Sequence, residues 1–249
     1  MMNKSGLIGL PLNNPSVLPW RSINEIACSS ALIVAPHPDD ETLGCGGAIA
    51  LLRSLNCHVQ VLVVSDGTLS HPRSLKYPAD KLSRLRKAET LSAMKLLGLE
   101  GNVVTFWGMQ DGSITTQYES VVASCRAYIT KVAPEIIFLP WRYDPHADHR
   151  ATSKLIKAAL DDLPLSPRLI EYPIWDWDWK QRGSLPASVE VTTWRLDIST
   201  VVELKQQAIA AYRSQITDLI DDDPEGFRLT PEMLANFTHP WEVYIEENL

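Results

Sequence analysis

The chain has 249 residues, of which 45% are hydrophobic and 21% are charged. This composition is close to that of ordinary soluble globular proteins, and it excludes a disordered chain and a disulfide-dense miniprotein. With 30 acidic and 23 basic residues the net charge is −7, so the chain lacks the general attraction to phosphate backbones that dedicated nucleic-acid binders have. Because no apolar stretch approaches the roughly 20 residues of a membrane-spanning helix, we expect no membrane span and no nucleic-acid partner.

The cysteines and the N-terminal residues bear on the compartment. The four cysteines form no CxxC pair and no regular spacing, so they indicate neither a structural zinc site nor a redox motif. Four free thiols favour a reducing compartment. The apolar run at residues 6–10 is too short for a signal peptide. We therefore predict a cytoplasmic protein with a lead-in segment over residues 1–25.

From residue 31 onward, short apolar runs alternate with stretches of helical periodicity. The runs predict buried strands, each bounded by Pro, Gly or Asp, at 31–35, 59–64, 103–107 and 135–139. The periodic stretches predict helices at 48–55, 81–97, 118–132 and 150–160. The alternation of strand and helix predicts an α/β fold with a Rossmann-like, doubly wound and mostly parallel sheet.

The pattern changes after residue 163. It predicts strands at 169–175 and 189–198, separated by a loop at 176–187. A helix is expected at 201–215, then a turn at 221–226 and a short helix that begins at Thr230-Pro231. Because no stretch is long enough to be an interdomain linker, we predict a single domain over residues 1–249, with an elaborated C-terminal third at 164–249.

Ionisable residues gather after two of the predicted strands. The first strand continues into PHPDDE at 36–41, and the fourth into WRYDPHADHR at 141–150. Parallel strands share a direction, so both clusters are expected at the same edge of the sheet, where such folds bind ligands. Two histidines with a carboxylate are a common ligand set for catalytic zinc. Either cluster alone could be an acidic helix N-terminus, but together they predict a metal site. Glu41 is interpreted as a first-turn carboxylate that accepts backbone N–H groups.

The motifs of this sequence resemble those of the LmbE/PIG-L family of zinc-dependent N-deacetylases. Residues 31–47, ALIVAPHPDDETLGCGG, are similar to its AHPDDE signature, and DPHADH at 144–149 resembles its HxDH motif. Residues 86–89, RKAE, resemble its RxxE, and the stretch 205–215 is similar to its K…A…SQ helix. The resemblance spans about residues 31–215. Because Tyr143 stands one residue further from the second motif than the tyrosine of some members, it receives no role.

The resemblance also implies roles for single residues. It implies a Zn²⁺ ion held by His37, Asp40 and His149. It implies Asp39 as the general base on a metal-activated water and His146 as the acid that stabilises the oxyanion and protonates the leaving amine. Asp148 would hold the His146 ring. The spacing itself does not distinguish Asp39 from Asp40 as base and ligand, so this division follows from the resemblance.

Three further residues are implied as contacts to sugar hydroxyls or a phosphate: Arg86, Asp111 and Gln215. Two of them also have a structural interpretation. Arg86 and Glu89 could form a helix pair at i,i+3, and Gln215 could end a helix.

The expected function is zinc-dependent hydrolysis of an N-acetyl or N-acyl group on a small amino-sugar substrate. Two alternatives are an amidase acting on a sugar-thiol conjugate or modified natural product, and a non-catalytic carbohydrate-binding protein. Dinucleotide binding is rejected, because HPDDETLGCGG stands where GxGxxG would be and its carboxylates would repel a pyrophosphate. A homo-oligomer is compatible with the sequence.

Two stretches allow more than one interpretation. IWDWDW at 174–179 is expected to be a strand with one buried aromatic face, the alternative being a loop whose rings stack on a sugar or acyl chain. The glycines around Cys45 are expected to permit close packing of a helix on a strand rather than to present a reactive thiol.

Overall fold

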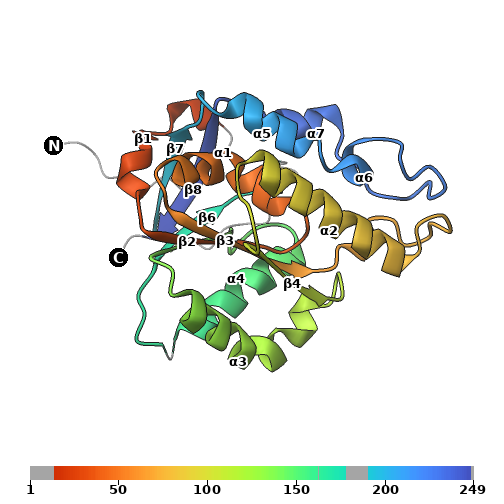
Figure 1. The fold of residues 1–249 in the computed structure, drawn as a ribbon, viewed down its shortest axis with the longest axis horizontal. Helices are drawn as coiled ribbons and strands as arrows, with labels where there is room; N and C mark the ends of the chain where they lie inside the picture. Colours follow the sequence, from red (N-terminus) through yellow and green to blue (C-terminus); the bar gives the residue numbers. More distant parts are fainter. Residues whose placement is uncertain (1–13, 162, 178–189, 248–249) are drawn as a thin grey trace.

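The structure is a computed structural model that describes residues 14–161, 163–177 and 190–247. A central sheet is covered by helices on both faces (Figure 1). In the described residues it has eight strands in the order β1-β7-β8-β6-β5-β2-β3-β4. All neighbours pair in parallel except β8, which is antiparallel to β6 and to β7. The predicted mostly parallel α/β fold is confirmed.

The strands are β1 (Trp20–Arg21), β2 (Ser30–Ala35), β3 (His58–Ser65), β4 (Val104–Met109), β5 (Ile136–Pro140), β6 (Arg168–Tyr172), β7 (Val191–Asp197) and β8 (Trp241–Glu247). The α-helices are α1 (Asp40–Ser54), α2 (Ala79–Leu96), α3 (Ile114–Val132), α4 (Ala147–Leu160), α5 (Val202–Ile209), α6 (Arg213–Ile216) and α7 (Pro231–Ala235). Short 3₁₀ helices are η2 (Pro15–Val17), η3 (Ile23–Ile26) and η4 (Thr68–Ser70).

β2 is the strand from which the two halves of the sheet diverge. The chain leaves β2 for β3 and β4 on one side, and later returns to place β5 on the other side. This creates a topological switch point between β2 and β5, and open α/β sheets bind ligands in the crevice beyond the strand ends at such a point. The two polar clusters of the sequence follow these two strands.

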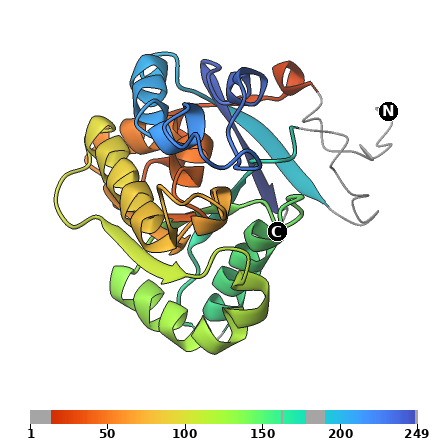
Figure 2. The ribbon, with the colours of Figure 1, turned by 90° about the vertical axis from the view of Figure 1, so that its right-hand side faces the viewer.

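Side chains that alternate along β2 pack into two separate hydrophobic cores. Ile33 and Ala35 pack in the core on the side of α1, whereas Leu32 and Val34 pack in the core on the side of α3 and α4. The view in Figure 1 shows α1, α2 and α5 on one face of the sheet and α3 and α4 on the other, and the turned view in Figure 2 shows the same layers. Because both faces are buried, the strand has a continuous apolar sequence rather than an alternating one.

Helix α1 begins earlier than the sequence pattern predicts. It starts at Asp40, within the polar motif, and its glycines allow close packing. A Cβ atom at residue 44 would overlap the ring of Tyr172, and one at residue 47 would lie 2.5 Å from Ile198 Cγ2. Cys45 between them is fully buried. The predicted packing role of these glycines is confirmed, but their low helix propensity obscured the first turns of the helix.

The C-terminal third differs from the prediction in three elements. The strand predicted at 169–175 ends at Tyr172, and residues 174–177 form bends and a turn, so the strand interpretation of the tryptophan segment is wrong for these residues. Trp179 and most of the predicted loop 176–187 lie outside the described residues. The helix predicted at 201–215 is divided into α5 and α6 around Tyr212. The sequence pattern did not predict β8, which lies between β6 and β7.

Candidate active site

The first functional segment is the sharp connection from β2 to α1. The His37 backbone N–H donates to Asp40 Oδ2 at 2.9 Å, so the carboxylate closes the connection onto the helix start. Between them, Asp39 has a φ of 122°, a conformation that non-glycine residues rarely adopt. Its backbone N–H donates to Glu41 Oε2 at 3.1 Å, which agrees with the role expected for Glu41. The carboxylate of Glu41 also accepts from the hydroxyl of Tyr212.

The second segment joins β5 to α4. His146 is the N-cap of α4, and its Nδ1 accepts from the backbone N–H of Asp148 at 3.2 Å. His149 follows in the first turn and is fully buried. The helix start thus presents one histidine to the cavity and another to the interior.

The two segments meet at the sheet edge. Asp40 Oδ2 lies 3.1 Å from His37 Nδ1 and 3.3 Å from His149 Nε2. The ring centroids of His37 and His146 are 4.8 Å apart, and those of His146 and His149 are 4.9 Å apart. The potential ligand atoms of His37, His146 and His149 all lie within 4.8 Å of one another, and so do those of His37, Asp111 and Asp148. The three ligands implied by the resemblance are therefore neighbours.

This donor set fits a zinc ion. Around tetrahedral zinc with bonds of about 2.0–2.1 Å, neighbouring donor atoms lie roughly 3.3–3.4 Å apart, close to the spacing of Asp40 from the two histidines. Within the part of the chain that the structure describes, neither buried ring nitrogen of His149 makes a hydrogen bond. An unsatisfied buried imidazole is costly, and coordination to a metal would satisfy it.

The electrostatics separate the two adjacent aspartates. Burial raises the pKa of Asp39 to about 8; the Arg86 charge opposes this shift, and the carboxylates of Asp40 and Glu41 add to it. Burial also acts to raise the pKa of Asp40, but His149 and His37 outweigh it and hold this pKa well below its usual range. Asp40 is thus a permanent anion suited to a cation, whereas Asp39 can exchange a proton near neutral pH.

His146 is held in its neutral form. Its pKa is lowered to about 4, chiefly by burial and in addition by the nearby His149 and His37 charges. Because Nδ1 accepts a hydrogen bond, the ring proton is assigned to Nε2. The carboxylate of Asp148 does not bond this ring: its Oδ2 accepts from the backbone N–H of Gly112 at 2.8 Å and lies 3.6 Å from His37 Nε2. Asp148 orients His146 through its backbone N–H.

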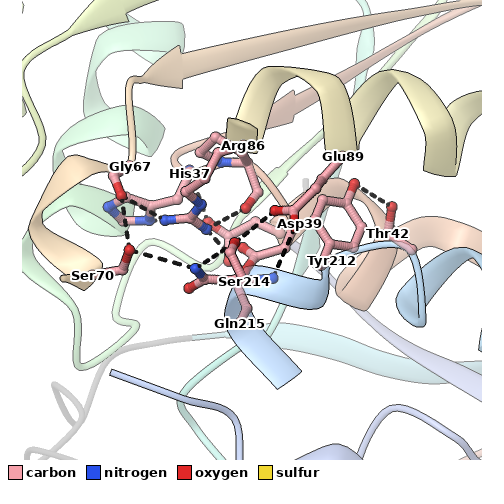
Figure 3. A network of polar contacts seen from close by, with 12 residues as sticks. His37, Asp39, Thr42, Gly67, Ser70, Arg86, Glu89, Tyr212, Ser214 and Gln215 are labelled. Carbon is pink, nitrogen blue, oxygen red and sulfur yellow. Dashed lines mark hydrogen bonds and ion pairs between the residues drawn. The ribbon is translucent and has the colours of Figure 1, made fainter. Parts of the chain in front are cut away.

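A polar network connects α2 and α6 to this site (Figure 3). Arg86 donates to Asp39 Oδ2 at 3.0 Å and to the carbonyls of Pro38 and Gly67, so it fixes the aspartate from the side of α2. One turn later, Glu89 accepts from the backbone N–H and hydroxyl of Ser214 at 2.8 and 2.6 Å. Arg86 and Glu89 therefore hydrogen-bond to different partners, and they do not form the i,i+3 pair that the sequence suggested.

A cavity of about 460 Å³ opens above the site. Its lining includes seven of the nine residues singled out from the sequence: His37, Asp39, Asp40, Arg86, Asp111, His146 and Gln215. The other two, Asp148 and His149, are buried against this lining. Trp175 also lines the cavity, with its ring centroid 5.5 Å from that of Phe227. The loop alternative for the tryptophan segment thus describes Trp175 better than the strand did.

Sequence reasoning assigned no role to Asp144. Its Oδ1 accepts from the His146 backbone N–H at 2.9 Å and lies 3.5 Å from His149 Nδ1. Its Oδ2 accepts from the backbone N–H groups of Ile174 and Trp175. Asp144 is part of the DPHADH motif, but its partners Ile174 and Trp175 follow β6 and are too distant in sequence for these contacts to be predicted.

The fold and the site define an α/β protein with a histidine–aspartate centre at the switch point of its sheet. A family model described as GlcNAc-PI de-N-acetylase, PIG-L, matches residues 32–160. The chain belongs to the PIG-L family, and the resemblance seen in the sequence is confirmed.

Two similar proteins accompany this membership, and a third shares the fold. The chain is 26% identical over 220 residues to a Bacillus subtilis (strain 168) protein named probable N-acetyl-alpha-D-glucosaminyl L-malate deacetylase 2, covering 86% of this chain and 95% of that protein. The solved N,N'-diacetylchitobiose deacetylase of Pyrococcus horikoshii superposes with a TM-score of 0.61 at 25% identity, over 77% of this chain and 72% of that one. GalB, the 4-carboxy-2-hydroxymuconate hydratase of Pseudomonas putida KT2440, has a TM-score of 0.60 at 23% identity, over 76% and 80%. The last likeness concerns the fold alone, so the site must decide the chemistry.

None of the helices in residues 14–161, 163–177 and 190–247 has both the length and the hydropathy needed to cross a bilayer.

Proposed function

We propose that the protein is a zinc-dependent N-deacetylase that removes an acetyl or related acyl group from the nitrogen of an amino-sugar derivative. The observation that carries this proposal is the meeting of His37, Asp40 and His149 at the wall of a cavity that also contains Asp39. The names of the relatives support it, since the Bacillus subtilis and Pyrococcus horikoshii proteins are both called deacetylases of N-acetylated sugars. The four free cysteines support a cytoplasmic location.

The residues divide into ligands and acid–base groups. His37, Asp40 and His149 would hold the zinc ion. When bound, zinc supplies Lewis acidity that lowers the pKa of a water molecule to about 7 and polarises the amide carbonyl. Asp39 takes the proton of the attacking water, which its raised pKa suits. Arg86 holds the Asp39 carboxylate in position during this transfer.

His146 acts at the other side of the scissile amide. Its Nε2–H can donate a hydrogen bond to the carbonyl oxygen as negative charge develops there. Asp39 then gives the proton that it took from the water to the leaving amine, because the neutral His146 keeps its Nε2–H on the oxyanion. Arg86, Asp111 and Gln215 are proposed to contact the sugar, because all three line the same cavity.

The first test combines metal analysis of the purified protein with acetate release from N-acetylglucosamine and its glycosides. We expect about one zinc ion per chain and acetate release that a chelator abolishes and added zinc restores. Zinc without release from any N-acetyl sugar would redirect the search to other amides. A protein that neither contains nor takes up zinc would overturn the proposal and favour carbohydrate binding without catalysis.

A further inference from the structure

The cavity above the candidate centre has a large apolar component that acyl transfer itself does not use. Side chains from five separate segments contribute to it, and we call this set the apolar wall: Leu43, Leu69, Trp175, Phe227, Leu229 and Met233. Trp175 and Phe227 meet edge to face at an interplanar angle of 76°. Large apolar side chains on the lining of a ligand cavity are a characteristic of sites that recognise apolar groups.

The wall is built into the fold rather than laid loosely over the site. The Phe227 backbone N–H donates to the Ser70 carbonyl at 2.6 Å, and the Leu229 N–H donates to the Gln215 carbonyl at 2.8 Å. A Cβ atom at residue 226 would overlap the ring of His71, so a glycine is needed where this loop crosses η4. The backbone that carries Phe227 and Leu229 is therefore tied on both sides to segments that form the catalytic cavity.

A neighbouring acidic loop strengthens this attachment. The carboxylate of Asp222 accepts from the Ser74 hydroxyl at 2.6 Å and from the backbone N–H groups of Leu75 and Lys76, both at 2.8 Å. Asp223 accepts from the Arg73 backbone N–H at 2.8 Å. The wall is thereby pre-organised, which lowers the entropic cost of binding a ligand against it.

The charges that line the same cavity do not favour an anionic group. Arg86 is the one lysine or arginine among the described residues of the lining, and its guanidinium already donates to Asp39 and to two carbonyls. A dicarboxylate such as the malate in the name of the Bacillus subtilis relative would find no unengaged cationic side chain among the described residues of this lining.

We propose that the apolar wall is an aglycone subsite, and that the substrate is an N-acyl amino sugar bearing an uncharged apolar group such as an aryl or bulky alkyl aglycone. This inference rests on the proposed deacetylation and adds the chemical class of the remainder of the substrate. The sugar would place its N-acyl group at the histidine–aspartate centre, while its aglycone displaces water from the rings of Trp175 and Phe227.

The test compares three substrates with the zinc-loaded full chain: benzyl N-acetylglucosaminide, N-acetylglucosaminyl L-malate and free N-acetylglucosamine. Acetate release gives kcat/KM, and calorimetry with the Asp39→Asn protein gives the affinity of the uncleaved ligands. We expect the benzyl glycoside to exceed both others by about tenfold or more in each measurement, since filling an apolar pocket discriminates on this scale. Equal values, or a preference for the malate glycoside, would overturn the inference.

Variants of the apolar wall test whether the substrate preference depends on these side chains. Phe227→Ala and Met233→Ala are expected to lower the ratio of benzyl-glycoside to free-sugar kcat/KM about tenfold, whereas Phe227→Leu retains most of it. Leu75→Ala, at a residue that is 91% exposed, is the matched control and should leave the ratio unchanged. Circular dichroism and thermal melting confirm that each variant is folded. A ratio unaffected by both alanine variants would refute the role of the wall.

The measurements separate this inference from the proposed function. Selective binding of the benzyl glycoside without acetate release from any substrate would reject the deacetylase and retain the apolar subsite. Acetate release from all three substrates without a preference would retain the deacetylase and reject the subsite.

Discussion

Asp39 shows how the geometry of one residue depends on several elements. A non-glycine residue at positive φ costs of the order of 1–3 kcal/mol and persists only where its surroundings determine it. Here Glu41 accepts the Asp39 backbone N–H, Tyr212 from the α5–α6 break donates to Glu41, and Arg86 on α2 donates to the Asp39 carboxylate. The strained conformation directs the carboxylate into the cavity while Asp40, the next residue, faces the histidines.

Asp39→Asn should separate catalysis from metal binding. The amide keeps the size of the side chain but cannot accept a proton, so we expect kcat to fall by about 10²–10⁴-fold. Zinc content should stay near that of the wild type, because the proposed ligands are untouched. Acetate release and metal analysis on the same preparation check both expectations. Loss of zinc in this variant would mean that Asp39 is a ligand and that the assignment of the two aspartates must be exchanged.

Asp144→Asn should weaken zinc binding without removing a proposed ligand. The Asp144 carboxylate lies beside His149 Nδ1 and accepts three backbone N–H groups. An amide would place N–H groups where acceptors are needed, and loss of such partners typically costs 10–100-fold in metal affinity. Competition with a chromogenic chelator measures this affinity. Asp161→Asn, at the exposed C-terminus of α4, is the control; equal affinities in the two variants would contradict the role of Asp144.

At the scale of elements, the sequence predicts the parallel core and loses accuracy where tertiary contacts decide. β2 and β5 are recognisable because strands buried on both faces are continuously apolar, and the polar motifs after them follow from that topology. The start of α1 is hidden because its glycines serve contacts with Tyr172 and Ile198 rather than helix propensity. The break after α5 has a similar origin, since Tyr212 turns inward to reach Glu41.

In the candidate site, too, some residues can be predicted from local sequence and others depend on tertiary contacts. Two local motifs predict the proposed metal ligands, because their chemistry is concentrated in a few consecutive positions. The apolar wall is assembled from segments that carry no local signal, and Phe227 and Leu229 lie in a loop that is held by tertiary contacts, among them backbone hydrogen bonds to η4 and α6. Residues of this kind can be assigned to the cavity only from the folded structure.

Gly47→Ala should test the close packing of α1. The added Cβ would lie 2.5 Å from Ile198 Cγ2, so either the helix or Ile198 must move. Overpacking of this kind costs about 1–3 kcal/mol in unfolding free energy, despite the better helix propensity of alanine. Chemical denaturation measures the change, and exposed Ser54→Ala on the same helix is the control. Adding Ile198→Val, which removes the Ile198 Cδ1 atom 2.8 Å from the new Cβ, should recover part of the loss; a stable Gly47→Ala protein would show that the contact is not tight.

Across the whole molecule, the site brings together residues from two separate strand-to-helix connections. His37 and Asp40 belong to the β2–α1 connection, whereas His149 belongs to α4 after β5. Glu89 and Ser214 extend the same linkage to α2 and α6 (Figure 3). A ligand that binds both connections stabilises the native chain, because the unfolded chain does not hold these groups together.

Metal removal should therefore lower the stability of the entire protein. A ligand present at about 100 times its Kd adds roughly 2.7 kcal/mol to the unfolding free energy. For a chain of this size, each kcal/mol shifts Tm by about 2–4 °C, so we expect chelation to lower Tm by about 5–10 °C and added zinc to restore it. Differential scanning calorimetry at fixed protein concentration measures the shift. His149→Ala removes one proposed ligand and should abolish the response to zinc, whereas His58→Ala, on the exposed start of β3, should retain it. A Tm that zinc leaves unchanged in the wild type, or raises equally in His149→Ala, would show that the metal does not bridge the two connections.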